Sequence, residues 1–216
     1  MSKPVIHHLN ISRSQRILWL CEELGLDYDI VHHQRDPETQ RSPASLCAVH
    51  PLGRSPTLVH DGHTIIESDA IIEYVTRRLA DGRLSVGPDS PAFGDYLQWL
   101  SFAEGSLMGP LVFDLIYAWT GGGNEVMKSF YHAEILKNHQ YLDATLATRD
   151  TVVATGFTAA DVNLGWTLEF SECRGWLRDF PRLTAYLARL RARPAYRRAI
   201  ARGGPQDLSV FAAGVT

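Results

Sequence analysis

The clearest local signals for the fold of this chain lie in HPLGRSPTLVHDGHTIIESDAI, His50–Ile71. This stretch contains two apolar runs, 57–60 and 63–66, which flank the dipeptide Asp61-Gly62. This dipeptide tolerates the positive φ angles of a type I′ turn, so the pattern predicts an antiparallel hairpin. The apolar residues then change to helical spacing, which predicts that a helix follows the hairpin directly.

The predicted helix covers SDAIIEYVTRRL, residues 68–79. Helical spacing places five apolar side chains on one face: Ala70, Ile71, Tyr74, Val75 and Leu79.

The residues before the hairpin predict a strand, a helix and a second strand. Residues 4–9 are predicted to form the first strand. Residues 12–25 carry apolar side chains at helical spacing, which predicts a helix that ends at Gly25. Residues 27–33 alternate as a second strand, and the polar segment 34–47 predicts a loop with one irregular helix. A strand–helix–strand order implies a right-handed crossover and a parallel strand pair.

The second half of the chain predicts helices and no strand. Residues 80–91, ADGRLSVGPDSP, have the composition of a linker. Helical patterns cover 93–119, 124–148, 158–170 and 181–200. The spacing of Thr158 and Asp161 predicts a capping box. The sequence therefore predicts an α/β domain over 1–80, a linker over 81–91 and an all-α domain over 92–216.

Composition excludes several classes of protein. The 216 residues include three widely spaced cysteines without a Cys-x-x-Cys pair, which argues against a zinc site and for a reducing compartment. The formal charge of −3 favours no nucleic-acid partner, and the arginine-rich segment 189–204 is interpreted as solvated helix faces. No apolar run approaches the ~20 residues of a membrane span. We therefore expect a soluble, cytoplasmic protein that binds neither nucleic acid nor membranes.

Ser12 lies where the first strand gives way to the first helix. Gln15 follows three residues later, so the pair predicts a capping box in which the Ser12 hydroxyl can still donate a hydrogen bond outward. A helix N-terminus stabilises an anion such as a thiolate. Lowering a thiol pKa of about 8.5 by about 2 units requires roughly 2.7 kcal/mol. No cysteine of the chain lies there, so the thiol would belong to a ligand. Ser14 is the alternative donor.

The hairpin stretch carries three further polar signals. The Ser55-Pro56 bond precedes a strand, so Ser55 can offer its backbone N–H and C=O to an extended peptide ligand. Glu67 can bind an ammonium group, while the N–H and hydroxyl of Ser68 can bind a carboxylate. An α-amino acid head group needs a partner for its ammonium group and one for its carboxylate at the same site. Each signal also has a plain structural alternative, an ordinary trans proline and a helix cap.

Three segments together resemble the glutathione S-transferase family. They are SRSQRILWLCEELGL at 12–26, HPLGRSPTLVHDGHTIIESDAIIEYV at 50–75 and FTAADVNLG at 157–165. The segments occur in the expected order and span most of the chain. The resemblance implies a thioredoxin-like β-α-β-α-β-β-α domain joined to an all-α domain, in agreement with the pattern of predicted elements.

The resemblance also implies a set of glutathione-binding residues. Pro56 matches a cis proline, and Ser55 matches the residue that pairs through its backbone with the cysteinyl part of glutathione. Glu67 and Ser68 match the pair that binds the γ-glutamyl head group. Arg54 stands near the expected place of the glycyl carboxylate, where a lysine is often found.

For catalysis the resemblance is to the bacterial, serine-type members, in which a serine donates to the thiolate, and Ser12 matches that serine. Candidates for the electrophile pocket are Ile11, Met108, Phe113 and Tyr117, each of which could equally be helix core.

The sequence thus predicts a detoxifying glutathione transferase, with glutathione as co-substrate, a hydrophobic electrophile as second substrate, no metal, and a homodimeric assembly. One alternative keeps glutathione but changes the reaction to that of a peroxidase, isomerase, dehalogenase or lyase. Another is a non-catalytic ligand-binding or interaction protein of the same fold. A two-domain glutaredoxin-like reductase is disfavoured because the dithiol is missing.

Overall fold

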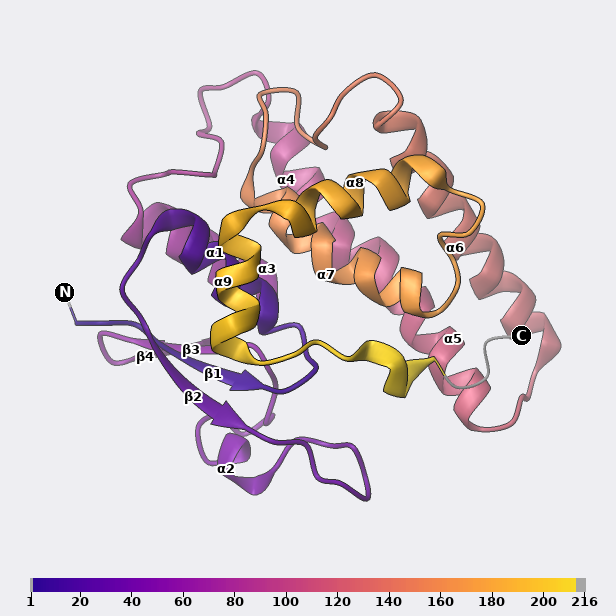
Figure 1. The fold of residues 1–216 in the computed structure, drawn as a ribbon, viewed down its shortest axis with the longest axis horizontal. Coiled ribbons are helices and arrows are strands. Elements are labelled where there is room, and N and C mark those ends of the chain that lie inside the picture. Colours follow the sequence, from indigo (N-terminus) through magenta and orange to yellow (C-terminus); the bar gives the residue numbers. More distant parts are fainter. Residues whose placement is uncertain (1, 213–216) are drawn as a thin grey trace. The chain divides into compact units, whose positions relative to one another are not determined.

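The structure is a computed structural model that describes residues 2–212 (Figure 1). The chain forms two units from four segments: Met1–Ser85 with Ala192–Gln206, and Val86–Arg191 with Asp207–Thr216. The change from unit 1 to unit 2 falls inside the predicted linker. Unit 1 also takes in 192–206, which the sequence pattern assigned to the all-α domain.

Unit 1 contains one four-stranded sheet with the order β2-β1-β3-β4. Its strands are β1 (Val5–Leu9), β2 (Asp29–His33), β3 (Thr57–His60) and β4 (His63–Ile66). On β1, Ile6 lies opposite Ile30 of the parallel strand β2 and opposite Leu58 of the antiparallel strand β3. Asp61 and Gly62 join β3 to β4 with φ angles of 47° and 78°. The predicted parallel pair and hairpin are both confirmed.

The helical elements of unit 1 are α1 (Gln15–Leu24), α2 (Ala44–Cys47), α3 (Ser68–Tyr74), the π-helical turn η1 (Val75–Leu79) and α9 (Pro194–Gly203). As predicted, α1 ends at Gly25, which has a left-handed φ of 62°. The predicted face of α3 is partly wrong: Ile72 is buried, while Ala70 is exposed. Exposing an alanine costs less apolar burial than exposing an isoleucine.

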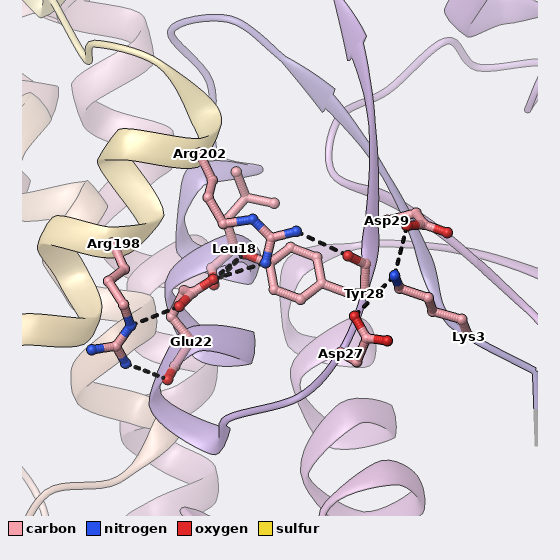
Figure 2. Close-up of polar contacts among 8 residues, drawn as sticks. All are labelled: Lys3, Leu18, Glu22, Asp27, Tyr28, Asp29, Arg198 and Arg202. Carbon is pink, nitrogen blue, oxygen red and sulfur yellow. Dashed lines mark hydrogen bonds and ion pairs between the residues drawn. The ribbon is translucent and has the colours of Figure 1, made fainter.

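Helix α9 is tied to α1 by a cluster of charges (Figure 2). Arg198 Nε and Arg202 Nη1 donate to the Glu22 carboxylate at 2.8 and 2.9 Å, and the Tyr28 hydroxyl donates to it at 2.9 Å. The Arg202 guanidinium also lies 3.8 Å from the centre of the Tyr28 ring. Both arginines lie on an exposed face of α9, as the interpretation of segment 189–204 as solvated helix faces expects. Their partners Glu22 and Tyr28, which lie far away in the sequence, were not predicted.

Unit 2 is helical. Its elements are α4 (Phe93–Phe102), the π-helical turn η2 (Ala103–Met108), α5 (Gly109–Trp119), α6 (Glu125–Thr145), α7 (Ala159–Cys173), α8 (Pro181–Ala192) and the short η3 (Leu208–Phe211). The first three run on without a break, as the pattern over 93–119 predicts. Helix α7 is buried along most of its length, and its Thr158–Asp161 capping box is present. Within residues 2–212 no strand follows Ile66, and none of the helices has the length and apolar character to cross a lipid bilayer.

We expect Glu22→Gln to lower the free energy of unfolding by about 1–3 kcal/mol at pH 7, because it weakens charge-assisted hydrogen bonds at a mostly buried carboxylate. Burial alone would raise the pKa of Glu22, but the bonds from Arg198, Arg202 and Tyr28 outweigh it and the pKa is lowered. A carboxyl group with a lowered pKa stabilises the fold above its unfolded pKa, and this contribution is lost as pH falls through the folded pKa. Denaturant unfolding at pH 7 and at about pH 3.5 should show the difference shrinking in acid.

Asp27→Asn is the matched control. The Asp27 carboxylate forms an ion pair with Lys3 Nζ at 2.9 Å, but its side chain is 85% exposed. Loss of this ion pair should therefore lower the free energy of unfolding by less than about 1 kcal/mol. If Glu22→Gln cost no more than Asp27→Asn, the charge cluster would not hold α9.

Candidate functional site

The predicted ligand-binding residues gather around one small pocket of unit 1. The pocket lies beside the residues that precede β3 and those that begin α3. It is lined by Arg13, Arg54, Ser55, Pro56, Glu67 and Ser68. All of these except Arg13 were predicted from the sequence. The structure thus brings together residues that are up to fourteen positions apart in the hairpin stretch, and one residue from the turn before α1.

The wall of the pocket before β3 is a tight turn. The Ser55-Pro56 peptide bond is cis, as the resemblance implies. The Thr57 hydroxyl donates to the Arg54 carbonyl at 2.6 Å, and the Leu9 amide donates to the Ser55 hydroxyl at 3.3 Å. These contacts fix the Ser55 backbone beside the end of β1.

The opposite wall is formed where β4 passes into α3. Glu67 has a φ of 73°, which is uncommon for a residue with a side chain. Its carboxylate lies 3.4 Å from Arg54 Nη1, and both side chains are more than half exposed. Ser68, in contrast, is buried. With Arg13, the pocket therefore presents one anion and two cations, an arrangement that can bind both charges of a zwitterion.

Ser12 does not cap α1. The helix begins at Gln15 and its N-cap residue is Ser14, so the predicted capping box of Ser12 and Gln15 is wrong. The Ser12 hydroxyl instead donates to the Leu9 carbonyl at 2.7 Å and accepts from the Ser14 amide at 3.3 Å. The turn before α1 is longer than the spacing indicated, and its first hydroxyl bonds the carbonyl at the end of β1.

This turn also contains a backbone outlier. Ile11 has a φ of 50°, a left-handed conformation that is rare for a β-branched residue. The Ile11 carbonyl accepts a hydrogen bond from Arg35 Nη2 at 3.0 Å, and the Arg35 amide donates to Asn10 Oδ1 at 2.8 Å. Outliers of this kind persist where the surrounding structure holds them and are frequent at functional sites.

Three hydroxyl groups and one imidazole meet beneath the pocket. Ser12 Oγ lies 3.1 Å from Ser55 Oγ and 2.8 Å from Ser14 Oγ. Ser14 Oγ lies 2.8 Å from His8 Nδ1. Ser14 is fully buried and is enclosed by these contacts, whereas the Ser12 hydroxyl contacts the hydroxyl of Ser55, which lines the pocket. The geometry therefore favours Ser12 over Ser14 as the group nearest to a ligand.

The sequence did not identify His8. Its side chain is buried, and burial together with the neighbouring His32 lowers the pKa of His8 to about 4. His8 Nε2 lies 3.0 Å from the carbonyl oxygen of Gly203 at the end of α9. The two residues are 195 positions apart, so no local signal could have connected them.

No cysteine of the chain supplies a reactive thiol at this turn. Burial raises the pKa of the Cys21 thiol on α1 to about 12, while Cys47 and Cys173 lie in other elements. Among residues 2–212, no group of three or more histidine, cysteine, aspartate or glutamate side chains is arranged to hold a metal ion. A thiolate at the turn would have to belong to a ligand.

Of the predicted electrophile-pocket residues of unit 2, Phe113 and Tyr117 lie next to each other on α5, with 6.2 Å between ring centres. Met108 is buried, and Phe113 stacks on Tyr131 with 4.0 Å between ring centres. The Tyr117 hydroxyl donates to Glu125. The large apolar side chains that α5 leaves exposed are Val112, Ile116 and Trp119.

Tyr117 lines a cavity of about 550 Å³ within unit 2. At its base the Asp114 carboxylate accepts from Arg174 Nε at 2.8 Å and from Trp176 Nε1 at 3.2 Å, and it lies 3.1 Å from His132 Nε2. This polar cluster was not predicted, because its members come from three separate segments.

Comparison with known proteins gives a consistent result. Residues 4–77 match the family model for the glutathione S-transferase N-terminal domain. Glutathione S-transferase 3 of Schizosaccharomyces pombe is 30% identical over 96% of this chain and 90% of its own. Glutathione S-transferase 1 of Saccharomyces cerevisiae is 26% identical over 91% and 94%.

Solved structures agree with these matches. A glutathione S-transferase from Actinobacillus pleuropneumoniae superposes with a TM-score of 0.88 at 28% identity and 98% coverage of both chains. Ure2p5 from Phanerochaete chrysosporium, crystallised with 1-(S-glutathionyl)-2,4-dinitrobenzene, has a TM-score of 0.71 at 23% identity, covering 94% of this chain and 95% of its own. At that identity the likeness shows the fold alone.

The exposed Arg54–Glu67 pair should add little to stability. We expect Arg54→Ala to change the free energy of unfolding by less than about 1 kcal/mol, because solvent screens the ion pair. Denaturant unfolding of the wild type and the variant provides the measurement. A larger loss would mean that Arg54 holds the turn before β3 and is not available to a ligand.

Proposed function

Since the chain belongs to the glutathione S-transferase family, we propose that it is a glutathione transferase that stabilises the glutathione thiolate at Ser12. The observation that carries this proposal is the placement of Arg54, Ser55, Pro56, Glu67 and Ser68 around one pocket. The Ser12 hydroxyl is 3.1 Å from the Ser55 hydroxyl at its edge. A protein that had kept only the scaffold would not need these groups together.

The pocket offers a partner for each charged or polar part of the tripeptide. Glu67 binds the γ-glutamyl ammonium and Ser68 its carboxylate, so both charges of the head group are met. The backbone of Ser55 pairs with the cysteinyl residue in an extended conformation. Arg54 binds the glycyl carboxylate, and its planar guanidinium can do so with two hydrogen bonds.

The thiol needs stabilisation only as an anion. Ser12 donates a hydrogen bond to the sulfur, and the N-terminus of α1, a helix of ten residues, adds its partial positive charge. Together these effects supply the roughly 2.7 kcal/mol that lowers the pKa of a thiol by about 2 units. The thiolate then attacks an electrophilic carbon, so no nucleophile of the protein is involved.

The second substrate is a hydrophobic electrophile. The candidates for contacting it are those expected from the sequence, Ile11, Met108, Phe113 and Tyr117. The exposed α5 side chains of Val112, Ile116 and Trp119 are additional ones. Peroxidase, isomerase, dehalogenase or lyase chemistry would use the same thiolate, and a panel of substrates distinguishes them. We further propose a homodimer in solution.

Ser12→Ala should lower the rate of conjugation to 1-chloro-2,4-dinitrobenzene about 10- to 100-fold at pH 6.5, since a hydrogen bond to a charged group is lost. The loss should be smaller near pH 9, where a free thiol with a pKa of about 8.5 ionises unaided. Steady-state kinetics across this range provide the measurement. Equal losses at both ends of the range would exclude the role of Ser12.

Glu67→Gln should weaken glutathione binding about tenfold, because the ligand's ammonium group loses its counter-charge. Titration calorimetry measures the affinity directly. Glu38→Gln, an exposed loop carboxylate outside the pocket, is the matched control and should bind glutathione like the wild type. Equal affinities for all three proteins would mean that the γ-glutamyl head group binds elsewhere.

A further inference from the structure

A continuous chain of polar contacts runs inward from Ser12. Ser12 Oγ lies 2.8 Å from Ser14 Oγ, and Ser14 Oγ lies 2.8 Å from His8 Nδ1. His8 Nε2 lies 3.0 Å from the Gly203 carbonyl oxygen. Ser12, Ser14 and His8 are all buried, so water does not interrupt the chain.

The Gly203 carbonyl sets the direction of the protons. A carbonyl oxygen can only accept, so His8 Nε2 must carry a hydrogen and donate it. In neutral His8 the other nitrogen, Nδ1, is then an acceptor, and Ser14 must donate to it. The Ser14 oxygen in turn can only accept from Ser12. With His8 neutral, the two nearest acceptors for the Ser12 hydrogen both lie inward, the Leu9 carbonyl at 2.7 Å and Ser14 Oγ at 2.8 Å, while Ser55 Oγ at the pocket edge lies at 3.1 Å.

This contact is built into the fold. A Cβ atom at Gly203 would lie 2.5 Å from Gln15 Oε1, 2.6 Å from Leu18 Cδ1 and 3.3 Å from His8 Nε2. A larger residue at this position would displace the side chains of Gln15 and Leu18, so glycine favours this close approach of the α9 backbone. The end of α9 and the start of α1 thus enclose the imidazole on both sides.

On the premise that glutathione binds as described above, we propose that His8 accepts its thiol proton through Ser12 and Ser14. The S–H bond breaks and its proton bonds to Ser12 Oγ. The original Ser12 proton moves to Ser14 Oγ, and the original Ser14 proton moves to His8 Nδ1. The products are a thiolate and an imidazolium, with no change of charge overall and no oxidation or reduction.

After the transfer, every hydroxyl in the chain points outward. His8 Nδ1 donates to Ser14, Ser14 donates to Ser12, and Ser12 donates to the thiolate. If His8 stayed neutral while Ser12 turned outward, the Ser12 oxygen would face both Ser14 Oγ and the Leu9 carbonyl without a proton between them. Reversal of the whole chain removes the conflict between the two hydroxyl oxygens.

Magnitudes decide whether the transfer is feasible. The cation on His8 is opposed by burial and by His32 and His33 of β2, and with a pKa of about 4 it is disfavoured about a thousandfold at pH 7. Each buried oxygen left without its proton costs a factor of about 5 to 150. Reversal of the chain removes one such contact, between the Ser12 and Ser14 oxygens, and the attraction between imidazolium and thiolate acts against the penalty in the same direction. His8 and Ser14 act through Ser12 and are positioning residues.

The test is nitrogen NMR of the histidine side chains in the wild-type protein at pH 7. With saturating glutathione, both His8 ring nitrogens should be protonated. With S-methylglutathione, which has no thiol proton, only Nε2 should be protonated. Ultraviolet absorbance of the same samples reports the thiolate. A thiolate beside a neutral His8 overturns the relay and leaves the glutathione site intact, whereas failure of glutathione to bind overturns both.

Two variants extend the test. Ser14→Ala breaks the chain, so His8 should stay neutral with glutathione bound and conjugation at pH 7 should fall about tenfold. Ser14→Thr keeps the hydroxyl and should restore both signals. His63→Gln, at an exposed position of β4, is the control and should change neither the protonation of His8 nor the rate of conjugation. Protonation of His8 in Ser14→Ala would overturn the relay even if the rate fell.

Discussion

The turn between β1 and α1 places more hydrogen-bond acceptors around Ser12 than its single proton can serve. The Leu9 carbonyl and the hydroxyls of Ser14 and Ser55 all lie within 3.1 Å of Ser12 Oγ. Any group that enters the pocket as an anion competes for that proton. The binding groups of the pocket, the orientation of His8 and the proposed thiolate chemistry all depend on how this competition is resolved.

The end of the chain takes part in this arrangement. Helix α9 belongs to unit 1, where Arg198 and Arg202 bind Glu22 of α1 and the Gly203 carbonyl fixes the tautomer of His8. A charge cluster near the surface and a buried contact beside the turn before α1 therefore lie on the same helix. A substitution in α9 that moves the Gly203 carbonyl should alter its hydrogen bond with His8 and, through His8, the hydroxyls of Ser14 and Ser12.

The sequence predicted what local patterns encode. The Asp61-Gly62 hairpin, the helical periodicities and the Thr158–Asp161 capping box depend on residues close together, and the structure confirms them. The residues of the hairpin stretch around the pocket were found for the same reason. The start of α1 was predicted wrongly because the Ser12 hydroxyl donates a hydrogen bond to the Leu9 carbonyl of β1 and does not accept one from an amide of the helix. His8 and the arginines of α9 were missed because their partners lie more than 170 positions away.

The pocket of unit 1 is proposed to bind glutathione and to lower the pKa of its thiol. Ultraviolet absorbance of the thiolate, followed against pH with glutathione bound to the wild-type protein, measures this directly. We expect a midpoint about 2 units below that of free glutathione, whose thiol has a pKa of about 8.5. A midpoint equal to that of the free tripeptide would contradict it.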